Sequence, residues 1–202
     1  MENKVILSLF CYSGNWPSFY KEAGYEVYQV DIKHDIDILS LDVESDILPL
    51  GKIHGILAAP PCTDFSGSGA QYWKVKDADG RTDSSLALVH KCLEIIDKTN
   101  PVFWALENPV GRLPTLVPKL GKPWYFNPHE FAGWLCGEDA ERERYTKRTG
   151  LWGSFNRPEK AALTVVPGCN PIMSLGGKSE RTKELRSMTP LGFAKAFFLA
   201  NP

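Results

Sequence analysis

Four short apolar runs, each followed at once by a polar turn, constrain the fold of this chain more than any other feature. The runs are residues 5–10, 25–30, 53–59 and 101–106. Each has the length and apolar content of a strand buried on both faces. Helix-like segments follow at residues 16–23, at 85–98, and at 191–200, where Thr189 is a candidate cap. This alternation predicts an α/β fold with a mostly parallel central sheet and flanking helices.

The polar residues that follow these strands are the candidate site. They are the turn at Tyr12–Asn15, then Asp31, Pro60-Pro61-Cys62 and Glu107-Asn108-Pro109. In an open α/β sheet, ligands bind at the carboxyl ends of the strands. We therefore expect these four segments to converge on one ligand.

The first strand, its turn and the acid that closes the second strand have the layout of a nucleoside site. A carboxylate about 20 residues after the turn can accept hydrogen bonds from ribose hydroxyls. The turn holds one glycine, and the G-x-G-x-x-G pattern of dinucleotide sites is absent. This disfavours a pyrophosphate and favours a nucleoside without phosphates, such as S-adenosyl-L-methionine. The alternative is a plain turn with an exposed Asp31. Asp37 could bind an adenine amino group, or it could simply belong to a charged loop. The candidate cofactor residues are therefore Phe10, Tyr12, Gly14, Asn15, Trp16, Asp31, Asp37 and Pro60.

The run Pro60-Pro61-Cys62 presents a thiol at a strand end. Two prolines fix the backbone and remove two hydrogen-bond donors. A nucleophile is the chemical interpretation, and a rigid turn with an incidental cysteine is the alternative. A reactive thiolate requires a lowered pKa at Cys62. The small residues of 66–69 and the aromatic and basic residues of 71–74 suggest a mobile lid.

Glu107 ends an otherwise apolar strand. A carboxyl group that is partly desolvated there has a raised pKa and can act as a proton donor. The alternative is a simple turn acid, because the following Asn108-Pro109 is itself a turn signal.

Cysteine usage and hydropathy restrict the remaining classes. The five cysteines are an odd number without C-x-x-C spacing, so we expect neither a disulfide framework nor a metal site. No apolar run is long enough to cross a membrane, and the N-terminus has no signal-peptide layout. We therefore expect a cytoplasmic protein without a membrane partner.

Charge is distributed unevenly along the chain. Residues 1–100 hold 9 Lys and Arg against 15 Asp and Glu, whereas residues 101–202 hold 14 against 9. A polyanion would therefore dock on the C-terminal half, unless the asymmetry is chance patterning of a solvated surface.

Several motifs, in order along the chain, resemble those of the DNA cytosine-5 methyltransferase family, particularly its compact phage-type members. The run Pro60-Pro61-Cys62-x-x-Phe65-Ser66 is similar to the catalytic loop of that family, and Glu107-Asn108-Pro109 to its Glu-Asn-Val or Glu-Asn-Pro element. Leu9-Phe10-x-x-x-Gly14 is similar to its cofactor loop. Met188-Thr189-Pro190-Leu191-Gly192-Phe193-Ala194 resembles its last motif.

The resemblance implies a Rossmann-like S-adenosylmethionine-dependent methyltransferase fold with a minimal recognition region. It implies that Cys62 adds to C6 of a flipped cytosine in DNA and that Glu107 assists at N3, so that a methyl group reaches C5. It also implies a cytoplasmic location in a bacterial or phage-infected cell. The implied DNA-binding residues are Pro61, Ser66, Asn108, Lys147 and Arg148. The implied divisions are a catalytic domain over 1–145, a short irregular basic recognition segment over 146–185, and a returning C-terminal helix over 186–202.

Some positions depart from the family pattern. Ser8 stands where members usually have an acid, Tyr12 and Asn15 replace glycines, and Thr63 replaces a common glutamine. The Gln-x-Arg-x-Arg strand of the family is replaced by a segment that contains Lys147 and Arg148. Because so little chain is left for target recognition, RNA or a free pyrimidine nucleotide remains an alternative substrate. A modified group on the donor, or an inactive nucleic-acid-binding homologue, is also open.

Overall fold

Six strands form one mixed sheet in the order β2-β1-β3-β4-β6-β5. The computed structural model describes residues 4–168 and 179–202. The strands are β1 (Val5–Leu9), β2 (Glu26–Val30), β3 (Ile53–Ala58), β4 (Phe103–Pro109), β5 (Trp124–Phe126) and β6 (Thr149–Ser154). The first four are parallel neighbours, and β6 and β5 extend the sheet in antiparallel pairing. The four predicted strands are confirmed. The architecture is the α/β fold that the alternation predicts and the Rossmann-like fold that the resemblance implies.

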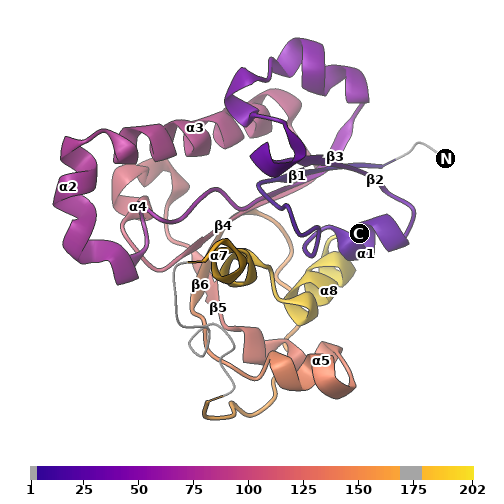
Figure 1. The fold of residues 1–202 in the computed structure, drawn as a ribbon. Coiled ribbons are helices and arrows are strands. Elements are labelled where there is room, and N and C mark those ends of the chain that lie inside the picture. Colours follow the sequence, from indigo (N-terminus) through magenta and orange to yellow (C-terminus); the bar gives the residue numbers. More distant parts are fainter. Residues whose placement is uncertain (1–3, 169–178) are drawn as a thin grey trace.

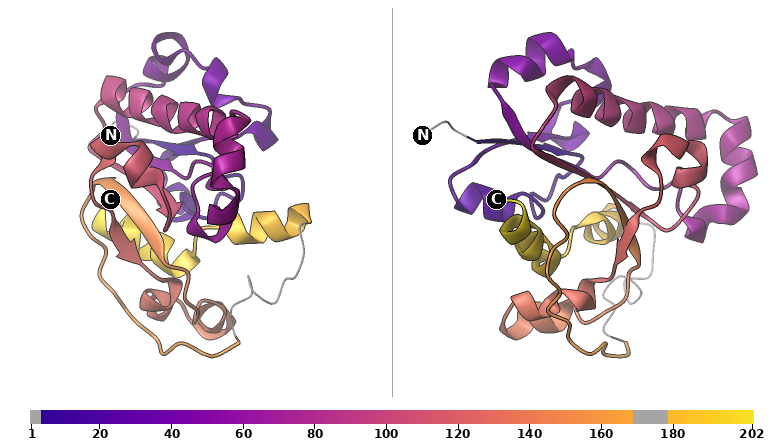
Figure 2. Two further views of the ribbon diagram at one scale, coloured as in Figure 1. Left: turned by 90° about the vertical axis from the view of Figure 1, so that its left-hand side faces the viewer. Right: turned by 180° about the vertical axis from the view of Figure 1, so that it is seen from behind.

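Helices cover both faces of this sheet (Figure 1). They are α1 (Ser18–Glu22), α2 (Trp73–Ala78), α3 (Arg81–Thr99), α4 (Leu113–Leu116), α5 (Gly137–Arg142), α7 (Glu180–Ser187) and α8 (Leu191–Ala200). The long α3 and the turns of residues 32–50 lie over one face, and α1 and α8 lie over the other, as the two turned views in Figure 2 also show. Each face has its own apolar core, one formed largely with α3 and the other with α8.

The α3 helix begins four residues earlier than its apolar spacing predicts. Gly80 precedes it in the left-handed conformation, and the first turn is polar. Apolar periodicity cannot mark such a turn, because Thr82 and Ser85 are buried to form hydrogen bonds rather than apolar contacts.

The segment 146–185 is predicted to be irregular, but a regular strand lies near its start. It contains β6, which is an interior strand between β4 and β5. Gly153 shows why β6 can lie so close to β4, since a Cβ at that position would be 2.0 Å from the carbonyl oxygen of Trp104. The sheet thus continues past residue 145, where the resemblance places the end of the catalytic domain.

The start of α8 is capped by a residue that the sequence does not single out. The expected Thr189 cap makes no such hydrogen bond. Instead, the carboxylate of Glu143 accepts the backbone N–H groups of Leu191 and Gly192. A helix N-terminus favours a negative partner, because its first N–H groups have no partner within the helix.

Glu143 provides a prediction about stability and pH. Burial raises its pKa to about 7, although the two backbone hydrogen bonds oppose that shift. Because the pKa in the folded protein lies above 4.5, the ordinary value for a glutamate, this group stabilises the fold most below pH 4.5, and that contribution is lost as pH rises through 7. The loss is on the order of 3 kcal/mol, since each pKa unit corresponds to about 1.4 kcal/mol.

We therefore expect the melting temperature to fall between pH 5 and pH 8 by roughly 5 °C more in the natural protein than in Glu143→Gln. Thermal melts of both forms at the two pH values measure this difference. Equal pH slopes in the two forms would contradict the assignment.

Candidate active site

The carboxyl ends of three neighbouring strands meet at one edge of the sheet. In the ladders, Leu9 of β1 pairs with Ala58 of β3, and Ala58 pairs with Leu106 of β4. The chain segments that follow these three residues therefore start side by side. This confirms the convergence predicted for the first turn, the Pro60 run and the Glu107 run.

Residues 60–66, named here the Cys62 loop, form a compact turn. The carbonyl oxygen of Cys62 accepts hydrogen bonds from the N–H groups of Phe65 (3.0 Å) and Ser66 (2.9 Å). The Phe65 ring is completely buried below the turn, whereas Pro61 is exposed. The Cys62 side chain is partly exposed between them. The loop thus places Cys62 at the strand end as a partly exposed residue, while Phe65 anchors the loop to the core.

Asn108 holds the start of the Cys62 loop. Its side-chain amide donates to the carbonyl oxygen of Pro60 at 3.0 Å, and no part of Asn108 is exposed. Asn108, predicted to contact DNA, is thus enclosed within the protein and bonded to the Cys62 loop. Pro60, a predicted cofactor contact, is likewise buried and takes part in this hydrogen bond.

Glu107 is close enough to Cys62 to affect the ionisation of its thiol. Burial raises the pKa of the Cys62 thiol, and the negative charge of Glu107 raises it further. Burial also raises the pKa of Glu107, in the direction that its strand-end position predicts. The expected lowering of the Cys62 pKa is therefore wrong for the protein alone, because desolvation and a neighbouring carboxylate both disfavour the thiolate.

Lys147 places a positive charge near Cys62 and Glu107, which opposes the effect of burial on their pKa values. It precedes β6, and the pairing of Pro109 with Thr149 brings it beside the end of β4. Its ammonium lowers the pKa values of both Cys62 and Glu107. The same group donates to the backbone carbonyl of Arg186 at 2.8 Å. A residue 85 positions after Cys62 thus joins the cysteine–glutamate pair.

Arg148, predicted together with Lys147, lies elsewhere. Its guanidinium is 4.4 Å from the centroid of the Tyr125 ring on β5. The structure therefore separates the two neighbouring cations, one at the pair and one over an edge strand.

The turn after β1 has unusual backbone geometry. Phe10 has a φ of 62°, which is uncommon for a residue with a side chain, and Gly14 has a φ of 69°. The N–H of Gly14 donates to the carbonyl oxygen of Cys11, which also accepts the side-chain amide of Gln29 at 2.7 Å. Strained residues of this kind persist where the surroundings fix them, and they cluster at ligand sites.

The predicted cofactor residues of this turn have different surroundings. Tyr12 is 47% exposed, and its ring lies near His34 and the ammonium of Lys33. Asn15 donates to the carbonyl of Thr189 and so ties the turn to the segment before α8. Trp16 is completely buried against α8. Trp16 is therefore a core residue rather than an open contact surface, because its large ring fills the space between α1 and α8.

The two carboxylates predicted to bind the cofactor, Asp31 and Asp37, lie in different surroundings. Asp31 follows β2 directly, and the N–H of Phe10 donates to the preceding carbonyl at Val30. Asp31 is therefore next to the turn, where its carboxylate also accepts the N–H of Lys33. Asp37 is exposed and accepts the N–H of Leu39, as expected for the loop alternative.

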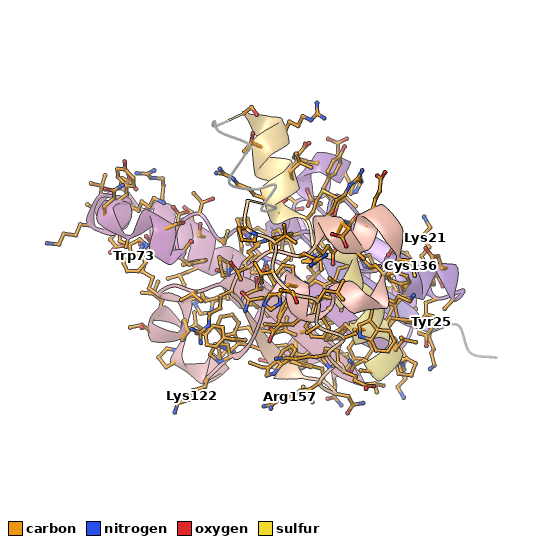
Figure 3. The ribbon with its side chains drawn as sticks, turned by 90° about the horizontal axis from the view of Figure 1, so that it is seen from below. Lys21, Tyr25, Trp73, Lys122, Cys136 and Arg157 are labelled. Atoms are coloured by element: carbon orange, nitrogen blue, oxygen red, sulfur yellow. The ribbon has the colours of Figure 1, made fainter. Side chains whose placement is uncertain are left out.

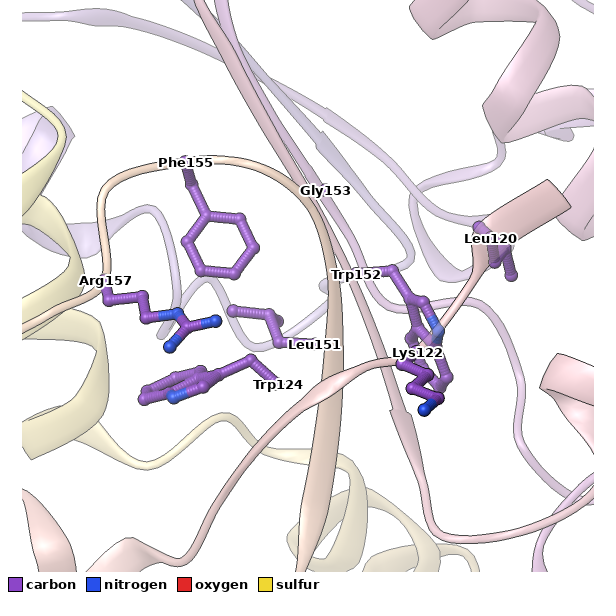
Figure 4. A pocket seen from close by; sticks show the side chains of 8 residues that line it. All are labelled: Leu120, Lys122, Trp124, Leu151, Trp152, Gly153, Phe155 and Arg157. Carbon is purple, nitrogen blue, oxygen red and sulfur yellow. The ribbon is translucent and has the colours of Figure 1, made fainter.

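A separate pocket of about 240 Å³ lies at the antiparallel side of the sheet (Figure 4). It is lined by Leu120, Lys122, Trp124, Leu151, Trp152, Gly153, Phe155 and Arg157. None of these residues belongs to the predicted site. The pocket contains residues from β5 and the C-terminal half of β6, whereas Lys147 precedes β6.

A parallel sheet with a strained turn after β1, and with a cysteine and a glutamate at the next strand ends, defines the Rossmann-like methyltransferase class. The family model for C-5 cytosine-specific DNA methylase matches residues 9–115, which include the turn, the Cys62 loop and Glu107. The chain belongs to this family. No curated protein matches the chain.

Two solved structures match parts of this chain. One is a DNA modification methyltransferase encoded within a prophage of E. coli, with 17% identity and a TM-score of 0.44, over 75% of this chain and 47% of that chain. The other is the Entamoeba histolytica methyltransferase EhMeth, with 12% identity and a TM-score of 0.49, over 90% of this chain and 62% of that chain. This chain spans less than two thirds of the length of either structure.

Within 4–168 and 179–202, every helix is too short or too polar to span a bilayer. In the same ranges there is no group of three or more side chains suited to hold a metal ion. Cys169 lies outside the described residues.

Proposed function

We propose that this protein transfers a methyl group from S-adenosyl-L-methionine to C5 of cytosine in DNA through a covalent Cys62 adduct at C6. The observation that carries the proposal is the coupling of three groups at one sheet edge. These are the Cys62 thiol, the Glu107 carboxyl and the Lys147 ammonium.

The chemistry needs both acids in defined protonation states. The Cys62 thiolate would donate an electron pair to C6, which makes C5 nucleophilic. Protonated Glu107 would donate a hydrogen bond to N3 and stabilise the negative charge that develops on the ring. After C5 is methylated, a base removes the C5 proton, the C6–sulfur bond breaks and the thiolate leaves. The raised pKa of Glu107 supports the protonated form that this role requires.

The turn after β1 would hold the cofactor. Its fit is supported by the left-handed backbone at Phe10 and Gly14, the partly exposed Tyr12 ring and the adjacent Asp31. When bound, S-adenosylmethionine would supply the methyl group. Asp31 would accept hydrogen bonds from ribose hydroxyls, and Tyr12 would contact the nucleoside.

Cytosine in a duplex hides C6 within the base stack, so the target base must be flipped out or already unpaired. Pro61 and Ser66 flank Cys62 on the loop and would contact that base. Lys147 would contact the base or its phosphate, and Arg148 would contact the backbone nearby. The basic composition of the C-terminal half supports a polyanionic partner.

Incubation with S-adenosylmethionine carrying a labelled methyl group tests the proposal. Labelled 5-methylcytosine in duplex DNA is the expected product. Parallel reactions with single-stranded DNA, tRNA and dCMP separate the alternatives, and transfer to dCMP without transfer to DNA would reject the DNA substrate. Binding of the cofactor without transfer to any cytosine would favour an inactive homologue.

Lys147 has a role that can be tested separately. Its ammonium lowers the pKa of Cys62, so Lys147→Met is expected to raise that pKa and slow methyl transfer at neutral pH by about tenfold. The pH profile of Cys62 alkylation measures the shift. Arg148→Met is the matched control for the alkylation profile, which is measured without DNA, since that cation lies over Tyr125. An equal shift in both variants would contradict a specific role for Lys147.

A further inference from the structure

A buried ion pair joins the Cys62 loop to α2. The proposed function uses neither residue of this pair. The ammonium of Lys76 on α2 is 3.1 Å from a carboxylate oxygen of Asp64, which belongs to the loop. The side chains are only 8% and 11% exposed. Buried charges of this kind are rare unless they are paired and hydrogen-bonded.

Further hydrogen bonds join this ion pair and its loop to the helices α2 and α3. Lys76 also donates to the carbonyl oxygen of Thr63 at 2.6 Å, and Thr63 is the residue that follows Cys62. The Ser85 hydroxyl of α3 donates to the other Asp64 oxygen at 2.6 Å. The backbone on the C-terminal side of the thiol is thus attached to α2, and the Asp64 side chain is attached to α3.

Arg112 joins the same network from the other side. Its Nε donates to the carbonyl oxygen of Asp64 at 3.1 Å, and its backbone N–H donates to that of Phe65 at 3.0 Å. Its guanidinium also pairs with Asp77 and lies 4.9 Å from the centroid of the Trp73 ring. The neighbouring Gly111 allows this approach, since a Cβ there would be 2.0 Å from the Phe65 carbonyl oxygen.

Stability alone does not explain such an arrangement. A buried ion pair commonly stabilises a fold no better than apolar residues of the same size, because both charges must be desolvated. What the pair adds here is a fixed backbone at Thr63 and a balanced local charge. The Asp64 carboxylate disfavours the Cys62 thiolate. Lys76 is the ion-pair partner of that carboxylate and balances its negative charge.

We propose that Asp64 and Lys76 are positioning residues that hold the Cys62 loop in one conformation and balance the electric field at its thiol. The use of that thiol in methyl transfer rests on the proposed function. The other charged groups that face Cys62 are Glu107 from β4 and Lys147 from the segment before β6.

Alkylation of Cys62 by iodoacetamide as a function of pH tests this proposal without DNA or cofactor. Mass spectrometry of the Cys62 peptide gives its rate separately from those of the other cysteines. Cys136 is exposed and lies at the opposite end of the molecule from Trp73, so it serves as an internal reference (Figure 3). Cys92 is completely buried in α3 and reports any unfolding.

The two single variants are expected to shift the Cys62 profile in opposite directions. Lys76→Met leaves the Asp64 carboxylate uncompensated, so the midpoint rises. Asp64→Asn leaves the Lys76 ammonium uncompensated, so the midpoint falls. Each shift is expected to be about half a pH unit, since a nearby charge shifts the pKa of a titrating group by an amount of this order. Asp79→Asn is the matched control, because it breaks the exposed pair with Arg81 in the same region and should leave the midpoint unchanged.

A purely structural role predicts a different pattern. Both variants would then lower the melting temperature and expose Cys92, with no shift or with shifts of the same sign, and either result would overturn the proposal. If a single variant does not fold, the double variant Asp64→Asn with Lys76→Met removes both buried charges at once. Its midpoint should stay near that of the natural protein, and its maximal methyl-transfer rate should fall about tenfold because the Thr63 tether is lost. An unchanged rate would overturn the proposal.

The alkylation results, unlike the methyl-transfer rate of the double variant, are independent of the proposed function. If the natural protein methylates no cytosine substrate, the proposed function fails. The opposite shifts of the Cys62 midpoint would still establish the role of the pair.

Discussion

Methyl transfer is expected to fall by about four orders of magnitude or more when Cys62 is replaced by alanine, because the addition to C6 then has no nucleophile. The fold should be retained, since Cys62 is partly exposed and its loop is held by Asn108, Phe65 and Lys76 rather than by the thiol. Labelled 5-methylcytosine measures the loss, and the melting temperature checks the fold. Cys136→Ala is the matched control, because that exposed cysteine precedes α5, away from the strand ends.

An oligonucleotide with 5-fluorocytosine provides a direct version of this test. Fluorine at C5 cannot be removed as the proton is, so the enzyme should remain attached to the DNA after the methyl group is transferred. The expected product is a covalent complex that resists denaturation and maps to Cys62. Full turnover by Cys62→Ala, or a complex that maps to another residue, would reject the mechanism.

The sequence predicts the parallel half of the fold well, for a physical reason. Strands buried on both faces appear as continuous apolar runs, and residues 5–10 and 53–59 are such runs. Since parallel strands carry their carboxyl ends to one edge, the proximity of the Pro60 run and Glu107 follows from the strand assignment alone. The strand β6 cannot be predicted in this way, because Gly150 and Gly153 interrupt its apolar pattern. Only the structure shows why glycine is needed there: a Cβ atom at these positions would lie close to the backbone of Asn108 or Trp104.

Side-chain roles are harder to infer, because they depend on contacts between distant segments. Asn108 belongs to a recognisable motif, but only the fold shows that its amide donates to Pro60. Glu143 and Lys76 have no sequence signal at all. Their partners, Gly192 and Asp64, are 49 and 12 residues away and approach them only when the chain is folded. A hydrogen-bonding role therefore needs the structure, whereas the position of a strand end does not.

Glu107→Ala is expected to slow methyl transfer by about two to four orders of magnitude, the usual contribution of a positioned proton donor. Glu107→Gln separates the charge of this group from its size. The raised pKa of Glu107 means that the protonated, active form persists at higher pH than for an ordinary glutamate, and activity is lost as pH rises through that pKa. Cys62 requires the opposite change, so the natural protein should show a bell-shaped rate profile whose two limbs belong to the coupled pair.

The glutamine variant should lose the alkaline fall of this profile, because its side chain no longer ionises. Its Cys62 alkylation midpoint should also move to lower pH, since the Glu107 charge that raises the pKa of Cys62 is gone. This shift is opposite in sign to that expected for Lys147→Met. Rate profiles and alkylation profiles of the two variants, measured side by side, therefore test the pair twice. If Glu107→Gln left both profiles unchanged, Glu107 would not be the proton donor, and the coupling between the two strand ends would have no part in the reaction.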